Sequence, residues 1–216
     1  MPSAFADRQD AGQVLAEQLK AYADRSDVIV LGLPRGGVPV AYEISKRLHV
    51  PLDVFIVRKI GVPGFEELAV GAIASGGVRV LNDDVVRQLP NADEIIGLAT
   101  AREQLELERR EKLYRNDRPP PDVQNKVAIL VDDGLATGAT MRAAVRALRQ
   151  RNVARIVVAV PVGAPETCRE LETEVDETIC AISPDYFQAV GQFYNDFGQT
   201  SDDEVRALLE QGQAQL

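Results

Sequence analysis

Histidine and cysteine are scarce in this 216-residue sequence, which contains one histidine and two cysteines. Zinc sites are commonly built from clusters of these residues, and a Ser-His-Asp triad needs a histidine base. The sequence therefore excludes a zinc finger, and we expect His49 to be a surface or helix-capping residue. Cys168 and Cys180 belong to no CxxC pair, so we expect two buried thiols in a protein from a reducing compartment.

Positive charge and long apolar runs are also lacking. The chain carries 24 Lys and Arg residues against 33 Asp and Glu residues, a net charge of −9 at pH 7. Nucleic acid is bound through Lys and Arg contacts to phosphate, so we expect no nucleic-acid partner. No apolar run reaches the length of a membrane-spanning helix, and residues 1–10 lack the apolar segment of an export signal. We therefore expect a cytoplasmic protein without a membrane partner.

Several common catalytic motifs are absent as well. The sequence has no GxxxxGK[ST] loop of the Walker type and no GxSxG nucleophile elbow. Its adjacent carboxylates, Asp132 and Asp133, do not form the Asp-x-Asp pattern of phosphatases. A response regulator would account for acidic residues at a strand end, but it leaves the residues of 137–140, Thr-Gly-Ala-Thr, without a role.

Short apolar runs alternate with segments of helical periodicity, and 45% of the residues are apolar, enough for a packed core. Five runs predict strands: Val28–Leu33, Leu52–Val57, Val127–Val131, Ile156–Val160 and Glu177–Ile182. Three of the segments between them predict helices: Val38–Leu48, Ala139–Arg151 and Pro165–Glu174. This order predicts one α/β domain over residues 1–216, with a doubly wound, mainly parallel sheet flanked by helices. We expect a core of about residues 28–182, with ligands bound at the carboxyl ends of the strands.

The remaining segments predict further elements outside this alternation of strands and helices. Residues 12–23 predict a first helix, and residues 70–81 predict a hairpin around Ser75-Gly76-Gly77. The charged segment Asp93–Arg115 predicts a long helix that is either solvated or a contact between subunits of a homo-oligomer. Residues 183–216 predict a small hood or tail that ends in a helix capped by Asp202.

The segment AILVDDGLATGAT, residues 128–140, carries the clearest chemistry. A strand runs into Asp132 and Asp133, whose carboxylates suit vicinal hydroxyls or a hydrated Mg²⁺. A loop with two glycines then opens a helix, so backbone N–H groups can close around an anion. Either aspartate alone would equally fit a turn or a helix cap. A phosphate site beside a site for vicinal hydroxyls is suited to bind a sugar phosphate.

This segment resembles the signature of the type I phosphoribosyltransferases, which bind 5-phosphoribosyl-1-diphosphate (PRPP). The signature has four apolar residues, two acidic residues, a short variable turn and Thr-Gly-x-Thr, and all of it is present. The resemblance implies that Asp132 and Asp133 hold the ribose hydroxyls and Mg²⁺ and act in catalysis. It also implies PRPP contacts, with the 5-phosphate in the loop, from Gly134, Leu135, Ala136, Thr137, Gly138, Ala139 and Thr140.

A second strand end has the same design. The run Val28–Leu33 leads through the turn Pro34-Arg35-Gly36-Gly37 into a helix. Such a turn alone is usually only a turn, but beside the first motif it predicts a second anion site. In the family the loop at this place binds the diphosphate of PRPP, often through an unusual backbone conformation. The resemblance therefore implies PRPP contacts from Arg35, Gly36 and Gly37.

Arg58 and Lys59 follow the predicted second strand, Leu52–Val57. Two cations at the carboxyl edge of the sheet would attract a polyanion such as PRPP, although they could also be a solvated pair. We expect both to bind PRPP and to assist the departure of diphosphate. In the family a mobile loop near this place covers the reacting centre, which implies a lid at residues 60–68. That segment is shorter and more acidic than the family leads us to expect.

Two functions from different classes fit these motifs. The first is a Mg²⁺-dependent phosphoribosyltransferase, in which a nitrogenous acceptor displaces diphosphate from PRPP. The alternative is a non-catalytic regulatory protein that binds PRPP or a nucleotide. The sequence does not identify the acceptor. Residues that could contact it follow the last strand, although we expect most of them to pack the tail instead: Asp185, Tyr186, Phe187, Phe193, Tyr194 and Phe197.

Overall fold

Five strands form the central sheet in the order β2-β1-β6-β7-β8, and all neighbouring pairs are parallel. The strands are β1 (Val28–Gly32), β2 (Leu52–Val54), β6 (Val127–Val131), β7 (Arg155–Val162) and β8 (Glu177–Ile182). The computed structural model describes residues 5–62, 65–89, 91–116 and 118–214. The parallel sheet confirms the predicted fold class, and the alternating order of strands and helices explains it.

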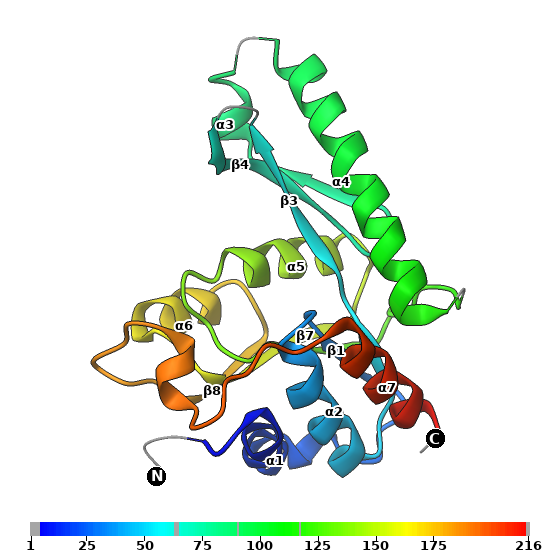
Figure 1. Ribbon diagram of the computed structural model, residues 1–216, viewed down its shortest axis with the longest axis vertical. Coiled ribbons are helices and arrows are strands. Elements are labelled where there is room, and N and C mark those ends of the chain that lie inside the picture. Colours follow the sequence, from blue (N-terminus) through cyan, green and yellow to red (C-terminus); the bar gives the residue numbers. More distant parts are fainter. Residues whose placement is uncertain (1–4, 63–64, 90, 117, 215–216) are drawn as a thin grey trace.

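Helices cover both faces of this sheet because successive side chains of a buried strand point to opposite faces. In β6, Ile129 belongs to one apolar cluster, whereas Ala128 and Leu130 belong to the other. One face carries α1 (Arg8–Gln18), α2 (Gly37–Leu48) and α7 (Asp202–Gln213). The other face carries α5 (Ala139–Arg149) and α6 (Pro165–Glu172), as Figure 1 shows. Two short 3₁₀ helices, η1 (Lys20–Tyr22) and η2 (Val190–Phe193), complete the core.

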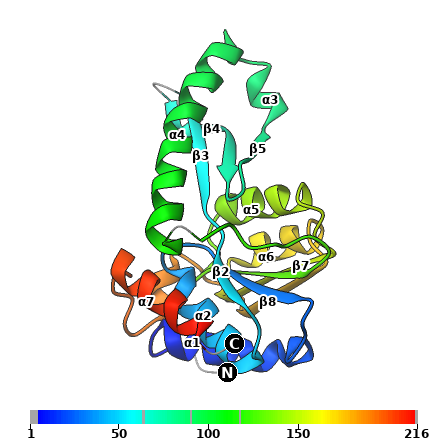
Figure 2. The same cartoon turned by 90° about the vertical axis from the view of Figure 1, so that its right-hand side faces the viewer.

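Between β2 and β6 the chain leaves the core and builds a projecting arm, which we define as residues 57–115 (Figures 1 and 2). Three antiparallel strands form its sheet: β3 (Val57–Val62), β4 (Phe65–Ala74) and β5 (Val78–Leu81). The short helix α3 (Asp83–Val86) follows, and the 24-residue helix α4 (Ala92–Arg115) returns along the sheet to the core. The predicted hairpin and the predicted long helix are therefore both confirmed.

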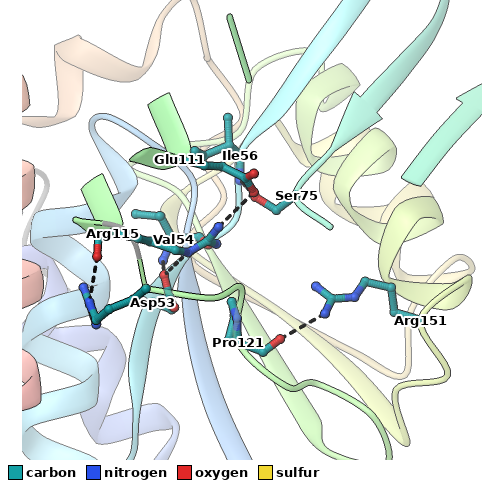
Figure 3. Close-up of polar contacts among 9 residues, drawn as sticks. Asp53, Val54, Ile56, Ser75, Glu111, Arg115, Pro121 and Arg151 are labelled. Carbon is teal, nitrogen blue, oxygen red and sulfur yellow. Dashed lines mark hydrogen bonds and ion pairs between the residues drawn. The ribbon is translucent and has the colours of Figure 1, made fainter. Parts of the chain in front are cut away.

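Arg115, the last residue of α4, ties the base of the arm to the central sheet (Figure 3). Its side chain is only 1% exposed, and its Nε lies 3.0 Å from Oδ1 of Asp53 in β2. Its two other nitrogens donate to the backbone oxygen of Val54 at 2.7 Å and to Oε1 of Glu111 at 2.8 Å. Each of the three guanidinium nitrogens has a partner, so this buried contact fixes where the arm leaves the core.

The expected strand Leu52–Val57 is wrong in one respect, because it is two strands in two sheets. β2 ends at Val54, and β3 begins at Val57 and pairs with β4 instead of with β1. Phe55 and Ile56 link them and are buried. An apolar run does not reveal such a break, because each part is buried in its own sheet. The expected loop at residues 60–68 is mostly β-hairpin, and residues 63–64 lie outside the described residues.

Two smaller expectations are also corrected. Cys168 of α6 and Cys180 of β8 form a disulfide, with a Cα–Cα distance of 6.7 Å, so they are not free thiols. The fold brings the two elements together beside Gly163, which has no side chain to separate them. The cap of α7 is Ser201, whose Oγ accepts from the backbone N–H of Glu204, and Asp202 is the first helical residue.

His49 is the C-cap of α2 in the left-handed conformation and is exposed, as expected. Among the described residues, no helix is both long and apolar enough to cross a membrane.

Candidate functional site

Two strand ends meet at the carboxyl edge of the central sheet. Gly32, at the end of β1, is in register with Val131, at the end of β6. The backbone N–H of Leu33 then donates to the oxygen of Val131 at 2.8 Å. The loops that follow, residues 33–36 and 132–138, therefore emerge side by side, which places both predicted anion sites in one region.

The turn Pro34-Arg35-Gly36-Gly37 packs directly against the acidic pair. A Cβ built on Gly36 would overlap the carboxylate of Asp133 and would lie 2.6 Å from its Cγ. A Cβ on Gly37 would lie 2.6 Å from the oxygen of Val131 and 2.8 Å from Cα of Asp132. Real Cβ atoms do not approach other atoms so closely, so both positions need glycine.

The same turn presents donors to a ligand. The peptide bond between Pro34 and Arg35 is cis, which is the kind of unusual backbone conformation that the resemblance implies. Arg35 is half-buried, and its side chain makes no ion pair or hydrogen bond with any described residue. Gly36 is the N-cap of α2 and has no capping side chain. The N–H groups of Gly37 and Val38 donate to the backbone oxygens of Leu33 and Arg35 at 3.0 and 3.1 Å, so this turn offers an anion the guanidinium of Arg35 and the positive end of the helix dipole.

The acidic pair is mostly buried, and its two carboxylates differ in their partners. Oδ1 of Asp132 accepts the backbone N–H of Asp133 at 2.9 Å. Burial raises the pKa of Asp132 well above its usual range, and the neighbouring Asp133 raises it further. Burial also raises the pKa of Asp133, whereas Arg8 acts to lower it. Donors or a cation from a ligand would compensate this buried negative charge.

Arg8, which no motif in the sequence singles out, binds Asp133. Its Nε and Nη2 lie 2.9 and 2.8 Å from Oδ2 of Asp133, and both side chains are largely buried, at 13% and 18% exposed. Nη1 donates to the oxygen of Gly198 at 2.7 Å, and the guanidinium lies 4.0 Å from the ring centroid of Phe197. Arg8 therefore joins helix α1, the acidic pair and the tail.

Tyr194 completes the support of the acidic pair from the tail. Its hydroxyl donates to the backbone oxygen of Asp133 at 2.6 Å, and burial raises the pKa of the phenol, so it remains a donor. Phe193 and Tyr194 are buried, Phe187 stacks on Phe193, and Tyr194 packs on Phe5. These residues pack the tail onto the core, as expected for most of the aromatic candidates. Tyr186 and Phe197 are exposed, at 70% and 37%.

The loop at residues 134–140 has the form of a phosphate site. Gly138 is the N-cap of α5 and has a φ of 70°, in the left-handed region that favours glycine. No side chain caps α5, and Thr137, Ala139 and Thr140 are exposed. Hydroxyls and the free N–H groups of the helix can therefore converge on one anion.

Neighbouring elements hold this loop in place. The N–H of Leu135 donates to the oxygen of Val162 at 2.8 Å, and the hydroxyl of Thr167 donates to the oxygen of Ala136 at 2.7 Å. Arg142 of α5 donates to the oxygen of Thr137 at 2.7 Å and is itself bound by Glu170 and Glu174. Apart from the N–H of Leu135, these contacts use carbonyl oxygens of the loop, so they leave its later N–H groups toward the helix for a ligand.

The expected position of Arg58 and Lys59, at the end of a strand of the central sheet, is wrong, because both lie within β3 of the arm. Their part in PRPP binding and catalysis stays a prediction. Neighbouring residues of a strand point to opposite faces. Arg58 forms an ion pair with Glu103 of α4, with an N–O distance of 2.6 Å. Lys59 lines a cavity of about 310 Å³ on the other face, which also includes Ala139. Lys59 therefore shares a cavity with Ala139, a residue of the loop at residues 134–140.

A parallel α/β core with a glycine-bearing loop beside a carboxylate pair at its strand ends has the arrangement expected of a sugar-phosphate-binding domain. The phosphoribosyl transferase domain family matches residues 6–197. The chain belongs to this family, which confirms the resemblance seen in the sequence.

Individual relatives agree with this assignment. A protein of Mycobacterium tuberculosis H37Rv, provisionally named a phosphoribosyl transferase, is 49% identical over 207 residues, which are 95% of this chain and 46% of that protein. The chain thus spans about half the length of the curated relatives it matches first. The crystal structure of TT1426 from Thermus thermophilus is 41% identical, with a TM-score of 0.86, and the match covers 96% of this chain and 98% of that chain. A uracil phosphoribosyltransferase of Lactobacillus gasseri is 31% identical over 156 residues, 69% of this chain and 71% of that protein.

Proposed function

We propose that this chain transfers the 5-phosphoribosyl group of PRPP to a nitrogenous acceptor and releases diphosphate. The observation that carries the proposal is the packing of Gly36 and Gly37 against Asp133 and Asp132. This packing supports a site in which two loops that could each bind an anion lie close to a carboxylate pair, and PRPP has two phosphate-bearing ends joined by a ribose with vicinal hydroxyls. Membership of the phosphoribosyl transferase domain family supports the same function.

In the proposed complex the two loops have separate tasks. The loop at residues 134–140 would hold the 5-phosphate through backbone N–H groups and the hydroxyls of Thr137 and Thr140. The turn at residues 34–37 would hold the diphosphate through the guanidinium of Arg35, with the positive end of the α2 dipole in support. Asp132 would accept the ribose hydroxyls. Lys59 could reach the ligand only from the arm, on the side of α5.

The proposed reaction breaks the bond between the anomeric carbon and the diphosphate and forms a bond from that carbon to an acceptor nitrogen. The transition state resembles an oxocarbenium ion, so positive charge develops on the ribose while negative charge leaves with the diphosphate. Asp132 and Asp133 would stabilise the first charge, and Arg35 would stabilise the second. Fixed loops at both ends of PRPP would hold the anomeric carbon in one place for attack.

The acidic pair also fits Mg²⁺. Oxygen is the ligand that this ion prefers, and in proteins it is often bound by one or two carboxylates together with substrate oxygens and water. Asp132 and Asp133 offer such a pair, and no larger group of metal-binding side chains occurs among the described residues. When bound, Mg²⁺ would neutralise part of the charge on the departing diphosphate.

The acceptor would bind between the acidic pair and the tail. Phe197 lies beside Arg8, the partner of Asp133, and its ring is partly exposed, whereas Tyr186 exposes its ring elsewhere on the tail. Such rings can stack on a flat heterocycle. The similarity to a uracil phosphoribosyltransferase makes uracil the first acceptor to test. The proposal covers the class of nitrogenous acceptors, because no base-specific contact is defined.

Diphosphate release tests the proposed reaction. We expect the chain, supplied with PRPP and Mg²⁺, to release diphosphate when one of a panel of pyrimidine and purine bases is added, with equal formation of the corresponding nucleotide. Omission of the base is the control, because water should be excluded from productive attack. If PRPP binds but no base yields a nucleotide, the chain is a PRPP-binding regulator and the proposed transfer is wrong.

A further inference from the structure

Helix α4 buries apolar side chains on one face and exposes two leucines on the opposite face. Ile96 and Leu107 are buried against the arm sheet and the core. Leu98 and Leu105 point the other way and are 69% and 70% exposed, more than half of each side chain. Residues seven apart lie on the same face of a helix, so the two leucines form one outward ridge on the arm. Figure 2 shows α4 along one side of the arm.

The residues along this ridge follow an order that is complementary to itself. From the N-terminal end they are Glu94, Leu98, Arg102, Leu105 and Arg109, spaced by three or four residues. An antiparallel copy of the same helix, centred between Ala101 and Arg102, places each leucine opposite the other leucine. The same alignment places Glu94 opposite Arg109 at both ends.

We propose that α4 is a self-association surface, on which a second copy of this chain packs its own α4 in antiparallel orientation about a two-fold axis. A two-fold interface uses the same patch on both copies, as this order of residues requires. Leu98 would contact the partner's Leu105, and Glu94 would contact the partner's Arg109. The proposal does not depend on the bound ligand or on the reaction.

The shape of this face suits the same partner. A cavity of about 420 Å³ lies beside Leu105, between α4 and β3, and it is lined by Arg58, Arg102, Glu103, Leu105, Glu106 and Arg109. The long alkyl stems of the arginines give it apolar walls below charged ends. The partner's Leu98 would enter this cavity as a knob enters a hole in a helix pair.

The charges at the two ends of the ridge favour this alignment, whereas the Arg102 side chains of the two copies meet near the two-fold axis. Glu94 makes no ion pair with any described residue, so its carboxylate is available to a partner. Arg109 binds Glu106 of its own helix and remains half-exposed, so it can bridge to a second carboxylate. A parallel pair would instead place Glu94 beside Glu94 and Arg109 beside Arg109, which like charges oppose.

The contact is one helix long and smaller than a standard stable interface, so we expect a weak, reversible dimer with a dissociation constant on the order of micromolar. Sedimentation equilibrium over a range of protein concentrations measures it. We expect Leu105→Glu to weaken association at least tenfold while leaving the circular dichroism spectrum unchanged. Tyr186→Ser, which alters an equally exposed apolar residue away from the arm, should associate as the unaltered chain does.

A charge exchange tests the antiparallel alignment itself. Glu94→Arg alone would set two cations opposite each other at both ends, and Arg109→Glu alone would set two carboxylates there. We expect each variant to associate at least tenfold more weakly than the unaltered chain at low salt, where charge is least screened. An equimolar mixture of the two should dimerise again, because every contact in the mixed dimer joins a cation to a carboxylate.

Each result decides the proposal. Recovery of dimers in the mixture, together with loss in Leu105→Glu, supports the antiparallel α4 pair. The proposal is wrong if the unaltered chain is monomeric at all concentrations, if Leu105→Glu dimerises as strongly as the unaltered chain, or if the mixture associates no better than its two components.

Discussion

Replacing Gly36 by alanine is expected to lower kcat/KM for the proposed transfer by about a hundredfold, because the new methyl group displaces Asp133. The built Cβ lies 2.6 Å from Cγ of Asp133. In folded proteins a Cβ normally stays at about van der Waals distance from other side-chain carbons. The carboxylate must move by roughly 1 Å, and such a displacement of a group at the reacting centre can cost about 10²-fold in rate. Steady-state kinetics with PRPP as the varied substrate measures the loss.

Gly97→Ala is the matched control for this substitution. Gly97 lies within α4, and a Cβ built there would meet no other atom within 4 Å. Alanine in an exposed helix stabilises by up to about 1 kcal/mol relative to glycine, so activity should be unchanged and the melting temperature should not fall. Full activity in Gly36→Ala would show that Asp133 is not held at the reacting centre.

Replacing Arg115 by methionine is expected to lower the free energy of unfolding by about 3–5 kcal/mol. The substitution keeps much of the apolar volume but leaves the carboxylate of Asp53 without its cation, in a place where that side chain is only 12% exposed. It also removes the donor to the backbone oxygen of Val54. Denaturant unfolding monitored by circular dichroism measures the change.

Arg110→Met separates this effect from the general loss of an arginine on α4. Arg110 pairs with Glu106 at 2.7 Å, and both side chains are about 30% exposed. Partly exposed pairs within a helix contribute less than about 1 kcal/mol, so Arg110→Met should be nearly as stable as the unaltered chain. Equal losses for the two variants would contradict the central role of Arg115 at the base of the arm.

The parallel core was predictable because its strands are short apolar runs that helical segments separate. The run Val127–Val131 coincides with β6, and Glu177–Ile182 coincides with β8. β6 is buried by helices on both faces, and β8 lies beside a strand that is buried in the same way. The apolar pattern of each run therefore agrees with its tertiary environment. The loop after β6 could also be recognised from the sequence, because its acidic residues and glycines lie close together in the chain.

The arm was not predictable as a unit, because its position depends on contacts between distant residues. The run from Leu52 to Val57 is uniformly apolar, and nothing in it marks the point where the chain passes from one sheet to the other. The break also reassigns Arg58 and Lys59, because alternation along β3 sends them to opposite faces. Only the pairing of β3 with β4 defines that strand.

Arg8 escaped prediction for a related reason. It is 125 residues from Asp133, in a helix whose local sequence indicates only an amphipathic segment. The disulfide between Cys168 and Cys180 likewise depends on the packing of α6 beside β8, not on a spacing motif. Partners at such separation emerge only when the fold is known, whereas a signature within one loop can be read directly.

Binding of PRPP in the presence of Mg²⁺ tests the central claim most directly, and isothermal titration calorimetry measures it. We expect saturable one-to-one binding to the unaltered chain, and binding about 10- to 100-fold weaker in a folded Asp133→Asn variant, because a charged acceptor contributes roughly 1.5–3 kcal/mol. Absence of binding by the unaltered, folded chain, or equal affinity in the variant, would contradict a PRPP site at the acidic pair.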